Sequence, residues 1–163
     1  MDANLISLIS LPSDQHPLVE VVRKMQVKDT DTLFIESNED MLQLAWNHSS
    51  TESATEALAI VADSTPIGFA MVTMNPSQVW IHSFMIDRGF QGQGWGRRAL
   101  LTLLEWIDGR CPISCCIELA SRNPIALSLY RSVGFVETHD ERATDFLERL
   151  GETFLCRKRN ERR

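Results

Sequence analysis

The sequence has little of what would place the chain outside the class of ordinary globular proteins. Its 163 residues contain no apolar run of about 18 residues, so no transmembrane helix is expected. Its first residues lack the basic flank and long apolar stretch of a signal peptide, and we expect a cytoplasmic protein. No repeats, low-complexity tracts or Pro/Gly-rich linkers occur, which predicts a single domain over residues 1–163.

Cysteine is scarce, with four residues at Cys111, Cys115, Cys116 and Cys156. Their spacing fits no zinc pattern, and the sequence shows no other metal-ligand cluster, so no metal site is predicted. The neighbours Cys115 and Cys116 point to opposite faces of any strand that contains them. We therefore expect reduced, mostly buried thiols.

Positive charge is rare outside the last seven residues. The chain carries a net charge of −6, and the tail 157–163 holds five basic residues and one acidic residue. The acidic remainder argues against nucleic acid as a partner and suits a cationic substrate. We expect the basic tail 157–163 to be a disordered, solvated end rather than a nucleic-acid-binding arm.

Apolar periodicity predicts a mixed arrangement of strands and helices. The order is a three-stranded antiparallel meander, a β-α-β crossover, and then a helix and a hairpin, which indicates the α+β class. Strands are expected over residues 5–11, 57–62, 67–74, 79–86, 114–119, 135–138 and 153–158, and helices over 17–26, from 37, from directly after residue 96 to 108, and from 124 to 134.

Three of the eight glycines, at positions 92, 94 and 96, lie between an expected strand and an expected helix. A dinucleotide fingerprint requires a glycine where Arg97 stands, and a P-loop requires Lys-Ser/Thr after its last glycine. Two interpretations remain. The glycines make a tight turn, or they direct backbone N–H groups and the helix N-terminus toward a phosphate, with Arg97 or Arg98 adding charge.

The segment Gln91-Gly92-Gln93-Gly94-Trp95-Gly96 resembles the Q/R-x-x-G-x-G/A signature of the GNAT N-acetyltransferases. A second block, N-x-x-A-x-x-L-Y-x-x-x-G-F, runs from Asn123 to Phe135. The resemblance implies the GNAT fold, a central, mixed, mostly antiparallel twisted sheet of six to seven strands with about four helices. Residues 25–28, 34–38 and 84–87 resemble the bacterial spermine/spermidine acetyltransferases more loosely.

The same resemblance implies that acetyl-coenzyme A is the co-substrate. Asn123 is expected to contact it, or to serve only as a helix cap. Tyr130, the single tyrosine, is expected to protonate the departing thiolate, or to be a core residue. The pyrophosphate would bind residues 91–97, namely Gln91, Gly92, Gln93, Gly94, Trp95, Gly96 and Arg97, and pantetheine would pair with the backbone of Phe84, Met85 and Ile86.

The acceptor amine must lose a proton before it attacks. A primary amine with a pKa near 10 requires about 4–5 kcal/mol for this at pH 7. His82 stands where related polyamine acetyltransferases carry a glutamate base, and histidine titrates near neutrality. A buried core histidine is the alternative, and Glu118 on the neighbouring strand is the second candidate base.

A polyamine such as spermidine or spermine is the first expectation for the acceptor, since it would favour an acidic pocket. The candidate carboxylates, which an ordinary acidic surface explains equally well, are Glu36, Glu39, Asp40, Glu52, Asp140, Glu141 and Asp145. An aminoglycoside, an amino acid or a protein N-terminus are alternatives. A non-catalytic acyl-coenzyme A sensor is another, although it has no need of Tyr130. The resemblance also implies a homodimer.

Overall fold

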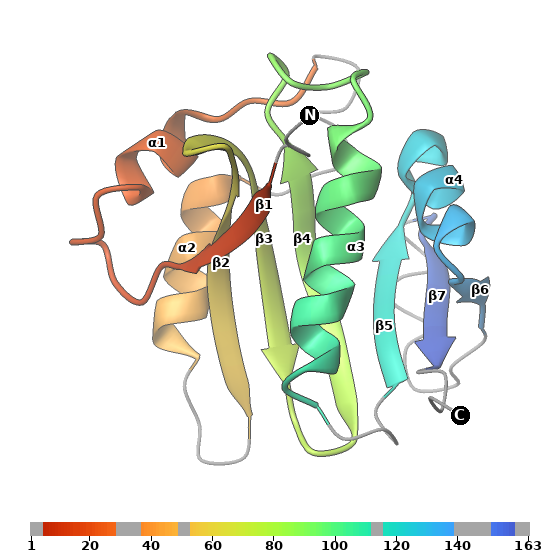
Figure 1. Cartoon of the computed structure of the whole chain (residues 1–163). Helices are drawn as coiled ribbons and strands as arrows, with labels where there is room; N and C mark the ends of the chain where they lie inside the picture. The colour runs from red at the N-terminus through yellow and green to blue at the C-terminus, as the bar shows by residue number, and fades with distance from the viewer. Residues whose placement is uncertain (1–4, 29–36, 49–52, 112–115, 139–150, 159–163) are drawn as a thin grey trace.

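A computed structural model describes residues 5–28, 37–48, 53–111, 116–138 and 151–158. Seven strands form one sheet in the order β1-β2-β3-β4-β5-β7-β6 (Figure 1). Neighbouring strands are antiparallel except β4 and β5, which are parallel. The strands are β1 (Ile6–Ser10), β2 (Ala54–Ala62), β3 (Thr65–Met74), β4 (Gln78–Ile86), β5 (Cys116–Ser121), β6 (Val136–Glu137) and β7 (Thr153–Lys158).

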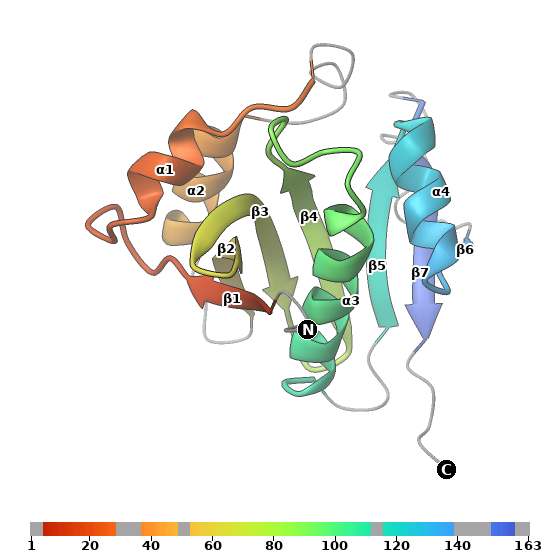
Figure 2. The same cartoon turned by 45° about the horizontal axis from the view of Figure 1, so that its top comes forward.

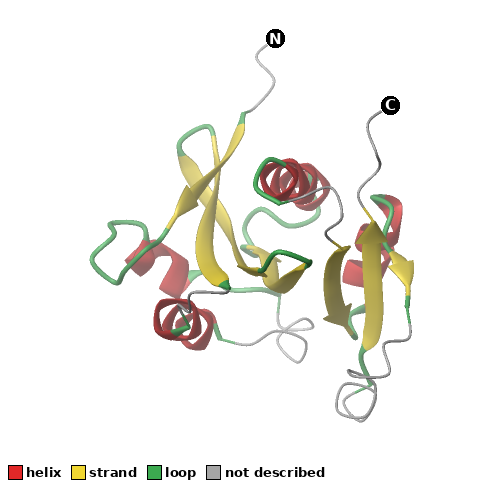
Figure 3. Ribbon diagram, turned by 90° about the horizontal axis from the view of Figure 1, so that it is seen from below, coloured by secondary structure: helices red, strands yellow, loops and turns green. Residues whose placement is uncertain are grey.

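Helices cover both faces of this sheet (Figure 3). The described helices are α1 (Val19–Lys24), α2 (Asn38–Asn47), α3 (Trp95–Asp108) and α4 (Pro124–Ser132). α3 and α4 pack on one face, and α1 and α2 pack on the other, over β2, β3 and the end of β4. The predicted α+β class, with a mixed, mostly antiparallel sheet and four helices, is confirmed.

The apolar stripe of α3 drives much of this packing. Leu100, Leu103, Leu104 and Ile107 recur at helical spacing and are at most 2% exposed against the sheet. Burial of each such side chain contributes about 2 kcal/mol to folding. Because the stripe fixes which side of α3 faces the sheet, it also fixes where the N-terminus of α3 and the preceding glycines lie.

Element boundaries differ from the sequence prediction where pairing extends a strand or a helix ends early. β2 begins at Ala54 rather than at residue 57, because its polar start pairs with the end of β3 and Thr55 is hydrogen-bonded to Thr73. α1 covers only Val19–Lys24, since Met25 is already extended. The turn before β3 is tight, with positive φ at Asp63 and Ser64.

Two expectations about the C-terminal region are wrong. Cys116 of β5 and Cys156 of β7 form a disulfide rather than two reduced thiols, because the register of these strands brings the two side chains onto the same face. Arg157 and Lys158 belong to β7, where they pair with Ile117 and Cys116, in agreement with the strand expected over residues 153–158 and against the disordered tail expected from residue 157. Residues 159–163 lie outside the described part. None of the described helices has the length and apolar character needed to cross a membrane.

Candidate active site

The two parallel strands at the centre of the sheet separate along their length (Figure 2). β4 and β5 pair at Gln78–Cys116, Val79–Ile117 and Trp80–Glu118, and no further pair joins their described residues. On its other edge, the end of β4 remains paired with β3, from Ala70–Phe84 to Gly68–Ile86. The backbone of Phe84, Met85 and Ile86 therefore keeps one edge that is not used by the sheet.

β4 is distorted just before that free edge. The register with β3 shifts between Met71–Ser83 and Val72–Ile81, so His82 is the extra residue of a β-bulge. Beyond it, the close approach of β3 needs Gly68, because a Cβ atom there would lie 2.3 Å from the carbonyl oxygen of Met85. Met85 and Ile86 are buried, which leaves their backbone as the part available for a ligand.

The glycine-rich loop follows β4 directly and is exposed at residues 92–94. Gly92 and Gly94 have φ of 76° and 82°, and a Cβ at either would meet nothing within 4 Å. Space is therefore not the reason for glycine there; the left-handed backbone is. The amides of Gln91 and Gln93 donate to the carbonyls of Ile86 and Gly89, which holds the loop onto the strand end.

The loop leads into the 14-residue helix α3, whose N-cap is Gly94. No side chain caps this terminus, so its first N–H groups keep their positive partial charge for a ligand. Arg97 and Arg98 are exposed in the first turn, and the Arg98 guanidinium lies 4.6 Å from the Trp95 ring centroid. The loop, the helix end and the arginines together suit an anion such as a pyrophosphate.

Asn123 and Tyr130 come from the next helix, α4. The Asn123 side chain accepts hydrogen bonds from the backbone of Ile125 and Ala126, so it is the helix cap that the sequence offered as one alternative. Tyr130 is 7% exposed, and its ring meets that of Phe135 edge-on at 5.8 Å. Burial raises the pKa of the Tyr130 phenol well above 10. Tyr130 therefore keeps its proton throughout the physiological range.

His82 projects from the bulge onto the face of the sheet that carries α1 and α2. Its Nε2 lies 2.8 Å from the hydroxyl of Thr73, and its ring stands edge-on to Trp80. His82 is partly exposed, but the surrounding protein disfavours the charged form. This desolvation, with repulsion from His48, lowers the pKa of His82 to about 4. His82 is therefore neutral at pH 7 and a weak proton acceptor.

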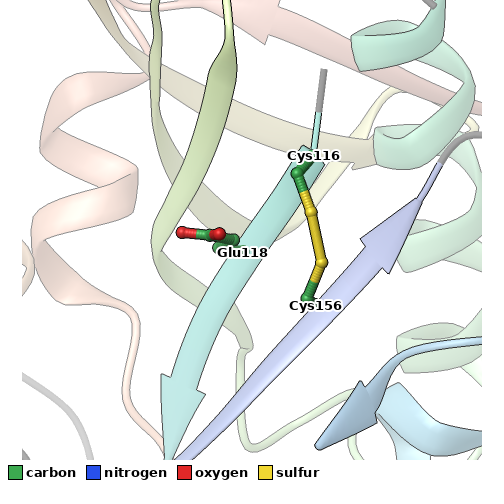
Figure 4. Close-up of side chains that lie close together, drawn as sticks. All are labelled: Cys116, Glu118 and Cys156. Carbon is green, nitrogen blue, oxygen red and sulfur yellow. A yellow bond between two sulfur atoms is a disulfide. The ribbon is translucent and has the colours of Figure 1, made fainter. Parts of the chain in front are cut away.

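Glu118 lies on the same face of the sheet as Trp80 and His82. It is the partner of Trp80 in the last pair between β4 and β5, and its carboxylate accepts a hydrogen bond from the amide of Gln78. The two sulfurs of the disulfide and a carboxylate oxygen of Glu118 lie within 4.8 Å of one another (Figure 4). The sequence indicated Glu118 only as a second candidate base. It carried no signal for Gln78 or Thr73, which strand register alone brings to the site.

This part of the sheet lies beyond the core under α1 and α2. Trp80, His82, Glu118 and Phe154 share one face, and that core includes none of them. Tyr130 belongs to the opposite layer, with the core under α3 and α4. The two faces of the sheet thus carry different groups, a protonated phenol in the core under α4 and a carboxylate with a neutral imidazole on the opposite face.

Two of the carboxylates expected to form an acidic pocket have local partners instead. Glu39 binds Arg23, which holds the pKa of Glu39 below its usual range, and also accepts from Gln43. Asp40 interacts with Ser37 at the start of α2. Glu39 is thus engaged in an ion pair, and Asp40 is used at the start of α2. The other expected carboxylates, Glu36, Glu52, Asp140, Glu141 and Asp145, lie outside the described residues.

The sequence profile of the Acetyltransferase (GNAT) family matches residues 19–135, which is most of the chain. The chain belongs to the GNAT acetyltransferase family. This family uses acetyl-coenzyme A, and the exposed glycine loop, the uncapped end of α3 and the free edge of β4 fit such a ligand. The resemblance to the GNAT family inferred from the sequence is confirmed, whereas the looser resemblance to the bacterial spermine/spermidine acetyltransferases is not supported by the curated relatives of this chain.

Two curated relatives of the chain are named for N-alpha-acetylation and alanine N-acetylation. The chain is 36% identical over 75 residues to the N-alpha-acetyltransferase RimI of Mycobacterium tuberculosis, covering 44% of this chain and 46% of the relative. It is 29% identical over 80 residues to the [ribosomal protein bS18]-alanine N-acetyltransferase of Salmonella typhimurium, covering 49% and 54%. The chain thus spans about half the length of these relatives.

Solved GNAT structures agree on the fold. The ribosomal-protein-S18-alanine N-acetyltransferase from Escherichia coli matches with a TM-score of 0.65 and 15% identity, over 98% of this chain and 97% of that one. A GNAT acetyltransferase from Elizabethkingia anophelis with acetyl-CoA bound matches with a TM-score of 0.63 and 14% identity, over 94% and 97%. At these identities the likeness concerns the fold alone.

Proposed function

We propose that this chain is an acetyl-coenzyme A-dependent N-acetyltransferase whose acceptor is the N-terminal α-amine of a protein or peptide. The observation that carries the proposal is the pair of proton-handling groups on opposite faces of the sheet, with Tyr130 in the core under α3 and α4 and Glu118 at the last pair of β4 and β5. The relatives named for N-alpha and alanine N-acetylation support the choice of acceptor.

The state of His82 also favours an α-amine. An α-amine has a pKa near 8, so its deprotonation at pH 7 costs about 1 kcal/mol, whereas a polyamine with a pKa near 10 needs about 4 kcal/mol. With its pKa lowered to about 4, His82 is a weak base. An α-amine acceptor therefore needs less help from a base in this site than a polyamine does.

Within the proposal the residues divide the work. Glu118 accepts the amine proton at its carboxylate and is oriented for this by Gln78. His82 is neutral and hydrogen-bonded to Thr73. It accepts a hydrogen bond from the approaching amine or donates one to it, according to its tautomer. Burial disfavours ionisation of Tyr130 and so keeps its hydroxyl protonated. In the proposal this proton passes to the departing sulfur.

The co-substrate supplies an activated acetyl thioester. Residues 91–97 would hold its pyrophosphate through backbone N–H groups and Arg97, and the free backbone edge of Phe84, Met85 and Ile86 would hold its pantetheine. The amide nitrogen of Asn123 stays available for the co-substrate, because capping uses only the Oδ1 atom.

Mass spectrometry of acetylated products tests the proposal. The assay compares a peptide that begins with a free alanine, the same peptide with a blocked N-terminus and an internal lysine, and spermidine. We expect acetylation of the free alanine peptide alone, reduced about 100-fold in Glu118→Gln. Glu105→Gln, which removes a carboxylate from the exposed side of α3, should retain full activity.

Preferred acetylation of spermidine would restore the polyamine as acceptor and reject the α-amine. Tight acetyl-coenzyme A binding without any acetylated product would instead favour the sensor. A homodimer, a cytoplasmic location and a single domain over residues 1–163 stay predictions.

A further inference from the structure

The disulfide lies beside the proposed base rather than in a remote part of the molecule. Cys116 stands two residues before Glu118 on the same face of β5, and Cys156 is the register partner of Glu118 on β7. The three side chains bring their ligand atoms within 4.8 Å of one another (Figure 4). Cys116 is also the partner of Gln78, the residue that holds the Glu118 carboxylate.

We propose that Cys116 and Cys156 form a thiol–disulfide switch that controls how available the Glu118 carboxylate is to the acceptor amine. This inference rests on the proposed function for its effect on catalysis, but not for the chemistry of the pair. The Cα atoms are 6.6 Å apart, within the usual disulfide range of about 4.4–6.8 Å. The bond can therefore form and break with the strands in place.

The reduced and oxidised states differ in the hydrogen-bond donors and the charge that lie near the Glu118 carboxylate. In the reduced state, two S–H groups near Glu118 donate weak hydrogen bonds to its oxygens, and any thiolate adds a like charge. In the oxidised state the sulfurs carry no protons, and Gln78 is then the donor that holds the carboxylate. We therefore expect the oxidised enzyme to be the more active one.

The exposure of the two cysteines determines which sulfur reacts first. Cys116 is partly exposed and Cys156 is only 9% exposed, so Cys116 reacts first with small molecules. Its thiolate attacks a low-molecular-weight disulfide, forms a mixed disulfide and releases one small thiol. Cys156 then attacks the Cys116 sulfur and releases the second. Two electrons pass from the protein sulfurs to the small disulfide, and the two cysteine protons end on the released thiols.

The chemistry of the pair is tested without any acceptor. Reduced protein is treated with oxidised glutathione in the presence of a chelator and mapped by non-reducing mass spectrometry. We expect a Cys116–Cys156 cross-link, a stable glutathione adduct on Cys116 in Cys156→Ser, and an adduct formed at least tenfold more slowly on Cys156 in Cys116→Ser. Cys111→Ala, which changes a buried cysteine outside this pair, should behave as wild type.

The electrostatic coupling between Glu118 and the cysteine sulfurs is measured by the alkylation rate of Cys116, which does not depend on catalysis. In reduced protein, Glu118→Gln removes the like charge beside the sulfurs, so iodoacetamide should alkylate Cys116 about three- to tenfold faster at pH 7.5. Glu105→Gln changes the same charge on α3 and should have no effect. Equal alkylation rates in Glu118→Gln and wild type would overturn the coupling.

Activity then completes the test. We expect kcat/KM for the alanine peptide to be about three- to tenfold higher in the oxidised state, and the difference to vanish in Cys116→Ser. Equal activity in both states, or failure of the cross-link to form, would overturn the switch. If the cross-link and the alkylation effect are found but neither state acetylates any amine, the proposed function fails while the redox pair stands.

Discussion

Glu118 of β5 lies opposite Trp80 of β4 in the last pair that joins these parallel strands before they separate. The carboxylate is consequently held at the apex of the opening, with Gln78 as its donor, while the ends of both strands are free of one another. A β-bulge two residues after Trp80 places His82 on the same face.

Replacing Gly94 by alanine should weaken acetyl-coenzyme A binding by at least tenfold. An L-residue disfavours φ of 82° by about 1 kcal/mol or more, and relief of that strain turns the loop N–H groups away from the ligand. Titration calorimetry measures the affinity. Gly109→Ala, at the other end of α3 with φ of −74°, is the matched control and should bind normally. Unchanged affinity in Gly94→Ala would mean that the left-handed backbone is not needed for binding.

Tyr130→Phe should lower kcat about 100-fold with a change in unfolding free energy of no more than about 1 kcal/mol. The ring and its contact with Phe135 are retained, and only the hydroxyl is lost. Because burial raises the pKa of Tyr130 well above 10, the wild-type pH profile should show no loss of activity from Tyr130 ionisation between pH 7 and 9.5. Wild-type turnover in the variant would remove Tyr130 from the mechanism.

His82 should make the protein less stable in mild acid. Its pKa is about 4 in the folded state and 6.5 as the ordinary value, so the unfolded chain binds the extra proton first. The contribution of neutral His82 to the unfolding free energy is complete above pH 6.5 and is lost as the pH falls toward 4. Since the side chain is partly exposed, we expect about 1 kcal/mol. Urea unfolding at pH 7 and pH 4.5 measures this, and His82→Asn should reduce the difference between the two.

Reduction of the disulfide should lower the unfolding free energy by about 3–4 kcal/mol. The bond closes a loop with a sequence separation of 40 residues, and opening it restores conformational entropy to the unfolded chain. Urea unfolding with and without a phosphine reductant measures the loss. The double variant Cys116→Ser, Cys156→Ser should be insensitive to the reductant, and an equal response in it would assign the effect to another cause.

Local features of the chain were predictable because short-range rules govern them. The glycines before α3, the apolar stripe of that helix and the Asn123 cap of α4 were all recognised from spacing within a few residues. The same segments carry the family signature, so the fold and the co-substrate class followed from them. Strand ends were less accurate, as at β2, because pairing with β3 extended the strand through polar residues.

The set of side chains on the face that carries Glu118 and His82 was decided by the tertiary structure. Residues far apart in the chain meet there through strand register, which brings Gln78 to Glu118 and Cys116 to Cys156. The neutral state of His82 likewise depends on desolvation by its neighbours, a property that the residue type alone does not contain. Sequence patterns thus determined which elements form, whereas long-range pairing and burial determined which side chains share a site and in which protonation state.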